Sequence, residues 1–117
     1  MTELSDTERV DHMDGRILDK LYDTIIARKG DDPSQSWSAK LLASAPELPA
    51  KKLAEESAEA IIEALKGDRK ALTKEAADVL YHLMVLLAAE DVKPDDVWAE
   101  LARREGQSGI DEKANRA

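Results

Sequence analysis

The chain has 117 residues, a net charge of −8, no Cys and no Phe, and only 3% aromatic residues. This length fits one domain, 1–117, and the missing cysteine excludes disulfides, thiolate zinc sites and cysteine nucleophiles. It also fits a cytoplasmic location. The negative charge argues against nucleic-acid binding, and no apolar run has the roughly 18–20 residues of a membrane span. A core of Leu, Ile, Val and Ala in a highly charged, glycine-poor chain predicts an all-α fold.

Helical spacing of the apolar residues organises the chain between a loose lead-in, residues 1–11, and a polar tail, residues 106–117. Between them the pattern predicts five helices, over residues 13–29, 36–44, 49–66, 69–90 and 94–105. Gly67 is the predicted C-terminal cap of the third helix, and Asp68 is the predicted N-terminal cap of the fourth. Because the connection between these two helices is short, we expect them to pack antiparallel.

The fourth predicted helix is apolar nearly all round. Its predicted core face consists of Leu72, Ala76, Val79, Leu80, Leu83, Leu86 and Leu87. A helix that is apolar on several sides is buried on more than one side, and a chain of this length has few helices to surround it. We therefore expect a homodimer, in which a second subunit completes an antiparallel helical bundle. The predicted apolar set of the third helix is Leu53, Ala54, Ala58, Ile61 and Leu65.

Two acidic patterns lie on these helices: E-E-x-x-E at Glu55, Glu56 and Glu59, and E-x-x-D at Glu75 and Asp78. At about 100° per residue each set lies on one side of its helix, so antiparallel packing can turn the sets toward each other. Converging carboxylates repel unless they bind protons or a hard cation. Oxygen ligands without Cys indicate Mg²⁺, as one or two ions, rather than a soft metal. The alternative is an ordinary solvated helix face.

The acidic patterns, in this order, are similar to the signature of the all-α nucleoside triphosphate pyrophosphohydrolases, the MazG-like group. Four further segments resemble the phosphoribosyl-ATP pyrophosphatase family: SWSAKLLA at 36–43, KKLAEESAEAIIEAL at 51–65, EAADVLYHLMVLLA at 75–88 and REGQSGIDEKANR at 104–116. The resemblance covers nearly the whole chain, residues 17–116. It implies Mg²⁺-dependent hydrolysis of phosphoribosyl-ATP to phosphoribosyl-AMP and pyrophosphate, the second step of histidine biosynthesis. It also implies a helical, dimeric fold.

The resemblance also implies roles for individual residues. The presumed metal ligands or bases are Glu55, Glu56, Glu59, Glu75 and Asp78. Glu56 and Glu55 are the candidate catalytic residues, and we hypothesise that Glu56 orients the attacking water. The candidate substrate-binding residues are Arg28, Ser36, Trp37, Lys40 and Lys51. His82 is interpreted as a packing or interface residue, and Tyr81 and Trp98 as core or interface residues.

Two other functions remain open from the residues. A general house-cleaning nucleoside triphosphate pyrophosphohydrolase would share the acidic patterns, but it would not predict the segment 36–43 or the polar tail. A non-enzymatic helical dimerisation module would carry acidic surfaces, would gain no stability from Mg²⁺, and would tolerate Asp78→Ala. A panel of substrates separates the two enzymes, and Mg²⁺-dependent stabilisation separates both from the module.

Overall fold

A computed structural model describes residues 13–106, and over that range the chain is helical with no strand. The predicted all-α fold is therefore confirmed. The lead-in 1–11 and the tail beyond Gly106 lie outside the described residues. None of the helices in the described range is long and apolar enough to cross a membrane. The helices are α2 (Ile17–Ala27), α3 (Trp37–Ala43), α4 (Glu47–Lys66), α5 (Arg69–Ala89) and α6 (Pro94–Arg104).

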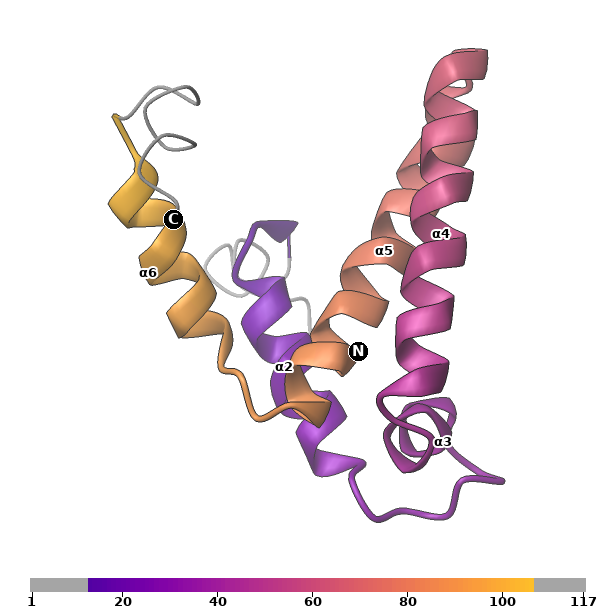
Figure 1. Ribbon diagram of the computed structural model, residues 1–117, viewed down its shortest axis with the longest axis vertical. Helices are drawn as coiled ribbons and strands as arrows, with labels where there is room; N and C mark the ends of the chain where they lie inside the picture. Colours follow the sequence, from indigo (N-terminus) through magenta and orange to yellow (C-terminus); the bar gives the residue numbers. More distant parts are fainter. Residues whose placement is uncertain (1–12, 107–117) are drawn as a thin grey trace, which may run out of the picture.

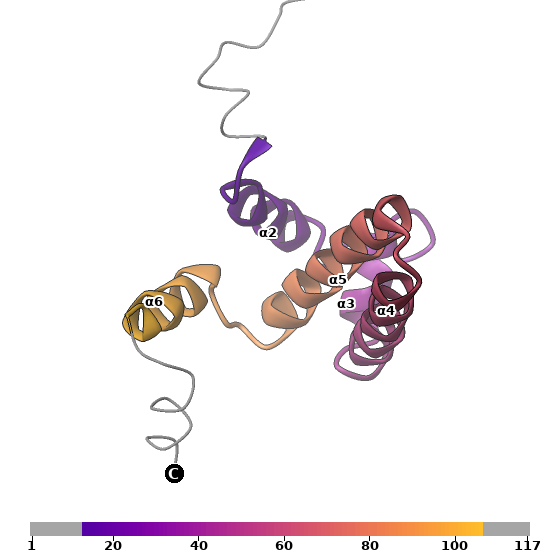
Figure 2. The ribbon, with the colours of Figure 1, turned by 90° about the horizontal axis from the view of Figure 1, so that it is seen from above.

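The two longest helices, α4 and α5, form an antiparallel hairpin and lie side by side along their length (Figures 1 and 2). The turn is tight because Gly67 ends α4 in the left-handed conformation, at φ 76°, which a glycine adopts without steric cost. Asp68 then caps α5, and its side chain accepts a hydrogen bond of 3.0 Å from the amide of Ala71. Both predicted caps are confirmed, and together they fix how α4 faces α5.

The helix starts are less well predicted than the helix ends. The third helix begins at Glu47 rather than at Pro49, so Pro49 is the third residue of α4 and is buried. A proline is tolerated there because the first-turn amides have no acceptor within the helix. The first predicted helix is also shorter than expected, since α2 begins at Ile17 after a turn in which Asp14 pairs with Arg16 at 2.7 Å.

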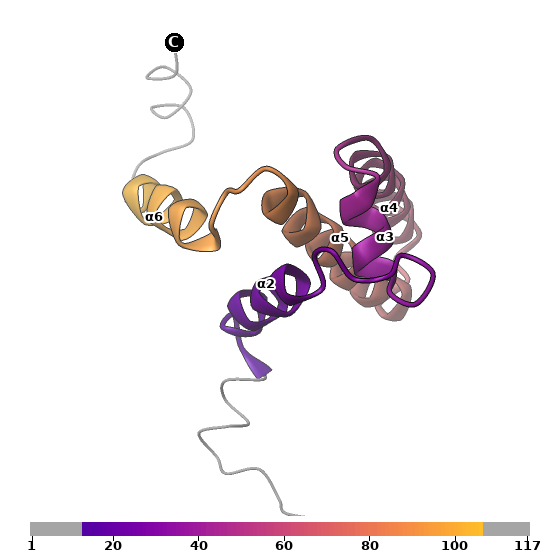
Figure 3. The same ribbon diagram turned by 90° about the horizontal axis from the view of Figure 1, so that it is seen from below.

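The core lies where α2 and α3 meet the second half of α5. Its fully buried side chains come from all three helices: Ile25, Leu41, Met84, Val85 and Ala88. Seen from below, α3 lies across one end of the α4–α5 hairpin, and α2 lies beside α5 (Figure 3). This arrangement places α3 against the same helix that carries half of the acidic patterns.

The predicted core faces of the two long helices are confirmed only in part within one chain, since Leu83 and Leu87 of α5 do pack against the core. On α5, Ala76 and Leu80 are exposed, whereas Met84 and Val85, assigned to its other sides, are fully buried. The predicted apolar set of α4 is likewise largely outside the core, and Leu65 is 83% exposed. The reason is that α5 is apolar on every side in its second half, so periodicity could not choose which side meets α2 and α3.

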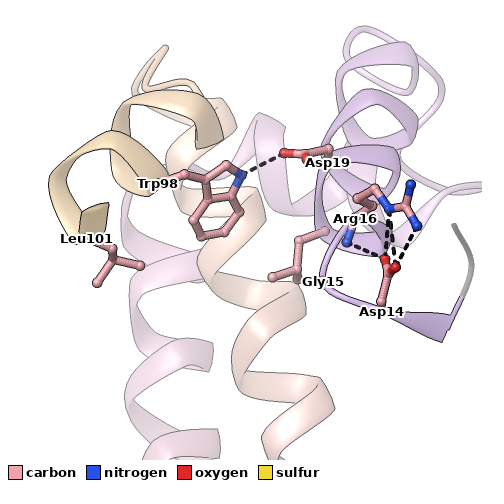
Figure 4. Close-up of a pocket in the computed structure, with 7 residues that line it drawn as sticks. Asp14, Gly15, Arg16, Asp19, Trp98 and Leu101 are labelled. Atoms are coloured by element: carbon pink, nitrogen blue, oxygen red, sulfur yellow. Dashed lines mark hydrogen bonds and ion pairs between the residues drawn. The ribbon is translucent and has the colours of Figure 1, made fainter. Parts of the chain in front are cut away.

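Helix α6 lies apart from the α4–α5 hairpin and packs on α2 (Figures 1 and 2). The joint is made by Trp98, whose indole Nε1 donates a hydrogen bond of 2.9 Å to Asp19 (Figure 4). A cavity of about 470 Å³ lies between the two helices, with Leu18 and Leu101 among its lining residues. Trp98 is therefore a packing residue at this joint, in agreement with its predicted role.

Candidate functional site

The hairpin brings the two predicted acidic patterns together. One carboxylate oxygen from each of Glu56, Glu75 and Asp78 lies within 4.8 Å of the other two. Over residues 13–106 this is the only group of three acidic or histidine side chains that could hold a metal ion in this way. Glu56 and Glu75 are half-buried and Asp78 is exposed. These three residues are called the carboxylate cluster below. The cluster is partly buried at Glu56 and Glu75 and open to solvent at Asp78.

Glu75 is the member of the carboxylate cluster whose pKa is raised. Hydrogen bonding to the carboxyl group of Glu56, followed by burial and the neighbouring Glu59, raises the pKa of Glu75 to about 7. Two carboxyl groups can share a hydrogen bond only if one of them holds a proton, so Glu75 retains its proton close to neutral pH. Its Oε2 atom is buried without a hydrogen-bond partner. Either a proton or a cation is needed to satisfy these oxygens.

The remaining acidic candidates on α4 lie in different surroundings. The carboxyl group of Glu59 adds to the raised pKa of Glu75, so it borders the carboxylate cluster. Glu55 is not brought into the cluster, because its side chain is 43% exposed and pairs with Lys52 at 3.5 Å. Farther along the helix, Glu63 pairs with Lys66 at 3.5 Å. Along α4, Glu56 thus belongs to the carboxylate cluster, whereas Glu55 and Glu63 form ion pairs with lysines of the same helix.

Helix α3 carries two of the predicted substrate-binding residues, Trp37 and Lys40, and a third, Ser36, directly precedes it. Ser36 caps the helix, since its Oγ accepts a hydrogen bond of 3.1 Å from the amide of Ala39. Trp37 is 45% exposed, and the Nζ of Lys40 lies 5.5 Å from the centre of its ring. At that distance the ammonium group is attracted to the aromatic face. An exposed aromatic ring beside a cation suits a base attached to phosphate groups.

The other two predicted cations lie on different elements. Arg28 follows the last residue of α2, is exposed, and lies 3.8 Å from Asp31. Lys51 is exposed near the start of α4, one turn before Glu55. Within the described part of the chain, no hydrogen bond or ion pair joins either cation to the carboxylate cluster. Their substrate contacts remain predictions.

Two polar contacts near the carboxylate cluster were not predicted from the sequence. The hydroxyl groups of Ser38 on α3 and Tyr81 on α5 lie 2.5 Å apart and are hydrogen-bonded. His82 is 7% exposed, and its Nδ1 donates to the backbone oxygen of Asp78 at 2.8 Å, which confirms its predicted packing role. Ser38 lies within the segment 36–43 singled out above, but no local pattern identifies a partner 43 residues away.

Comparison with known proteins gives one consistent result. A family model described as phosphoribosyl-ATP pyrophosphohydrolase matches residues 18–105. A protein named phosphoribosyl-ATP pyrophosphatase in Dinoroseobacter shibae is 65% identical over 100 residues, covering 86% of this chain and 98% of that protein. Proteins of the same name in Ruegeria pomeroyi and Paracoccus denitrificans are 65% and 64% identical. The matches cover 86% and 85% of this chain, and 95% and 92% of those relatives.

Proposed function

The chain belongs to the phosphoribosyl-ATP pyrophosphohydrolase family, and we propose that it performs the family's reaction with Mg²⁺ held by the carboxylate cluster. The reaction is the hydrolysis of phosphoribosyl-ATP to phosphoribosyl-AMP and pyrophosphate, in histidine biosynthesis. The observation that carries the metal assignment is the convergence of Glu56, Glu75 and Asp78 from two helices. A cytoplasmic location and the absence of nucleic-acid binding rest on the sequence argument alone.

The carboxylate cluster fits a hard divalent cation. Carboxylate oxygens are the ligands that Mg²⁺ prefers, and the site offers one from each of three side chains. The buried Oε2 of Glu75 lacks a hydrogen-bond partner, so a cation would satisfy an atom that the protein leaves unpaired. Glu59 borders the site and is available for a second ion. A solvated helix face would carry neither the buried unpaired oxygen nor the raised pKa of Glu75.

The residues of the site divide the work of hydrolysis. Mg²⁺ bound to the carboxylate cluster would neutralise charge on the phosphate oxygens of the substrate. Glu56, half-buried within the cluster, would hold the metal with one carboxylate oxygen and is assigned, through its other oxygen, to orient the attacking water and accept its proton. Glu55 is the second candidate for this role, from a more exposed position one residue earlier. A water molecule held between the base and the phosphate has already lost translational and rotational entropy. The reaction therefore need not lose that entropy at the transition state.

Substrate contacts are assigned to the exposed residues around α3. Trp37 offers its ring to the purine, while Lys40, beside that ring, moves to a phosphate when the base stacks. Ser36 holds the start of α3 through its cap and contributes its hydroxyl group at the helix N-terminus. Arg28 and Lys51 supply further positive charge. Because the chain as a whole is acidic, these cations and the metal must offset its repulsion of a polyphosphate.

The test is release of pyrophosphate from phosphoribosyl-ATP, measured with and without Mg²⁺ beside a panel of ordinary and damaged triphosphates. We expect Mg²⁺-dependent release from phosphoribosyl-ATP alone. Glu56→Gln keeps the size of the side chain but removes the base, so kcat should fall by about 10²- to 10⁴-fold. Glu63→Gln, on the same helix but outside the carboxylate cluster, is the matched control and should retain activity. Release mainly from free triphosphates would favour the house-cleaning function instead.

We also propose that the chain acts as a homodimer. Large apolar side chains on the hairpin are exposed in the single chain: Ile61 is 61% exposed, Ile62 51%, Leu65 83% and Leu80 41%. Exposed large apolar side chains in such number on one hairpin are typical of a protein that buries them against a partner. Helix α5 is also apolar on sides that do not contact α2 or α3. A second copy of the chain that covers these sides would explain why they are apolar.

A further inference from the structure

We propose that the hydrogen bond between Ser38 and Tyr81 is a positioning contact, which holds the substrate-binding face of α3 in register with the carboxylate cluster. This proposal rests on the function proposed above. It adds two residues that neither the acidic patterns nor the predicted substrate contacts include. Both act through their neighbours and need not touch the substrate.

The active site is divided between elements that are far apart in the chain. The carboxylate cluster belongs to the α4–α5 hairpin, whereas Trp37 and Lys40 belong to α3. Helix α3 has only seven residues, so it cannot hold its place by its own stability. Its position depends on contacts with α5 and α4. The placement of Trp37 and Lys40 relative to the carboxylate cluster therefore depends on how firmly α3 is held against the hairpin.

Apolar packing anchors α3 but does not set its register. Ala39 and Leu41 are 2% and 0% exposed, and Leu41 belongs to the core cluster with Met84 and Val85 of α5. Such burial is non-directional, because it depends on the area removed from water. A small rotation of so short a helix changes the buried apolar area little. A directional contact is needed to select one position.

The Ser38–Tyr81 hydrogen bond is that directional contact. Within residues 13–106, no other side-chain hydrogen bond or ion pair joins α3 to α4 or α5. Each of the two bonded residues is close in sequence to one part of the site: Tyr81 to the carboxylate cluster, and Ser38 to the substrate-binding residues of α3. Tyr81 follows Asp78 by three residues, which is about 4.5 Å along the helix axis. Ser38 follows Trp37 directly and lies on α3 with Lys40.

Loss of the contact should weaken substrate binding more than the chemical step. Trp37 and Lys40 are assigned to parts of the substrate that do not react, and the carboxylate cluster stays intact on its own two helices. Loss of such uniform binding raises KM and leaves kcat nearly unchanged. The net contribution of one neutral hydrogen bond corresponds to a rise in KM of about three- to tenfold. The affinity for Mg²⁺ should not change.

The experiment compares the wild type with Ser38→Ala, Tyr81→Phe and the double variant, by KM and kcat for phosphoribosyl-ATP, Mg²⁺ affinity and thermal unfolding. The double variant should resemble either single variant, because all three lack the same bond. Ser38→Thr retains a hydroxyl group and should restore a KM near that of the wild type. Trp98→Phe is the control: it removes a hydrogen bond between α6 and α2, away from the carboxylate cluster, and should leave KM unchanged.

Two results would overturn the proposal: a KM that stays at the wild-type value in the double variant, or an equal rise in Trp98→Phe, which would indicate general loosening. Failure of the metal site is a separate result. It would appear as Mg²⁺-independent hydrolysis in the wild type, or as activity kept in Glu75→Gln, and the KM comparison could still be made.

Discussion

Binding of Mg²⁺ to the carboxylate cluster should depend on pH through one group, Glu75. Its carboxyl group is hydrogen-bonded to that of Glu56 and half-buried, so its pKa is raised to about 7. A protonated carboxyl group is a poor ligand, so the cation must displace this proton before it can bind. Binding should therefore weaken as the pH falls below 7 and level off above it.

The size of the effect follows from linkage between proton and metal. For one displaced proton with a pKa of about 7, the apparent Mg²⁺ affinity falls about tenfold between pH 8 and pH 6. The stability of the metal-free protein should change in the opposite direction and fall as the pH rises. Because the pKa of Glu75 is raised above its usual 4.5, the stability that its proton contributes is complete below pH 4.5 and is lost as the pH rises through 7. The metal-free melting temperature should thus decline across this interval.

Calorimetric titration of Mg²⁺ into the wild type and Glu75→Gln at pH 6, 7 and 8 measures this directly. Glutamine keeps the size of the side chain and one oxygen but cannot titrate, so the variant should bind Mg²⁺ more weakly and with no pH dependence over this range. Glu63→Gln should behave like the wild type. The reasoning is wrong if wild-type affinity is constant between pH 6 and 8, or if the tenfold change persists in Glu75→Gln.

Three further outcomes follow from the packing. Met84→Ala should lower the free energy of unfolding by about 2–5 kcal/mol in a denaturant titration, because Met84 is fully buried in the core. Asp68→Ala should cost about 1 kcal/mol in the same assay by removing the cap of α5, whereas Asp68→Asn should cost little. Leu65→Glu places a charge on the proposed dimer surface, so the mass measured in solution should fall toward that of one chain, while Lys66→Glu beside it should not change the mass.

The sequence predicts the parts of this fold that depend on local rules. Gly67 and Asp68 define the hairpin turn because one permits a positive φ and the other supplies a cap, and both requirements are met within two or three residues. The convergence of Glu56, Glu75 and Asp78 follows from that turn together with helical periodicity. These inferences need no knowledge of how distant segments pack.

Contacts between residues that are far apart in the sequence could not be predicted from the sequence. The bond between Ser38 and Tyr81 spans 43 residues, and that between Asp19 and Trp98 spans 79. Neither leaves a pattern in either segment alone. The sequence also does not show the register between facing helices, so it cannot tell that Glu55 pairs with Lys52 whereas Glu56 faces Glu75. Homology supplies the reaction, but only packing separates adjacent carboxylates.

The electrostatics of the chain connect these observations. A protein of net charge −8 must bind a substrate that carries several negative charges. Its carboxylate cluster adds to that difficulty unless a cation occupies it. In the absence of a cation, the hydrogen bond to Glu56 and burial raise the pKa of Glu75 to about 7, so that this residue holds a proton instead. In the proposed function, a divalent cation displaces this proton and presents positive charge to the substrate. Lys40 on α3 can then contribute to affinity, provided that the proposed positioning contact between Ser38 and Tyr81 holds that helix in place.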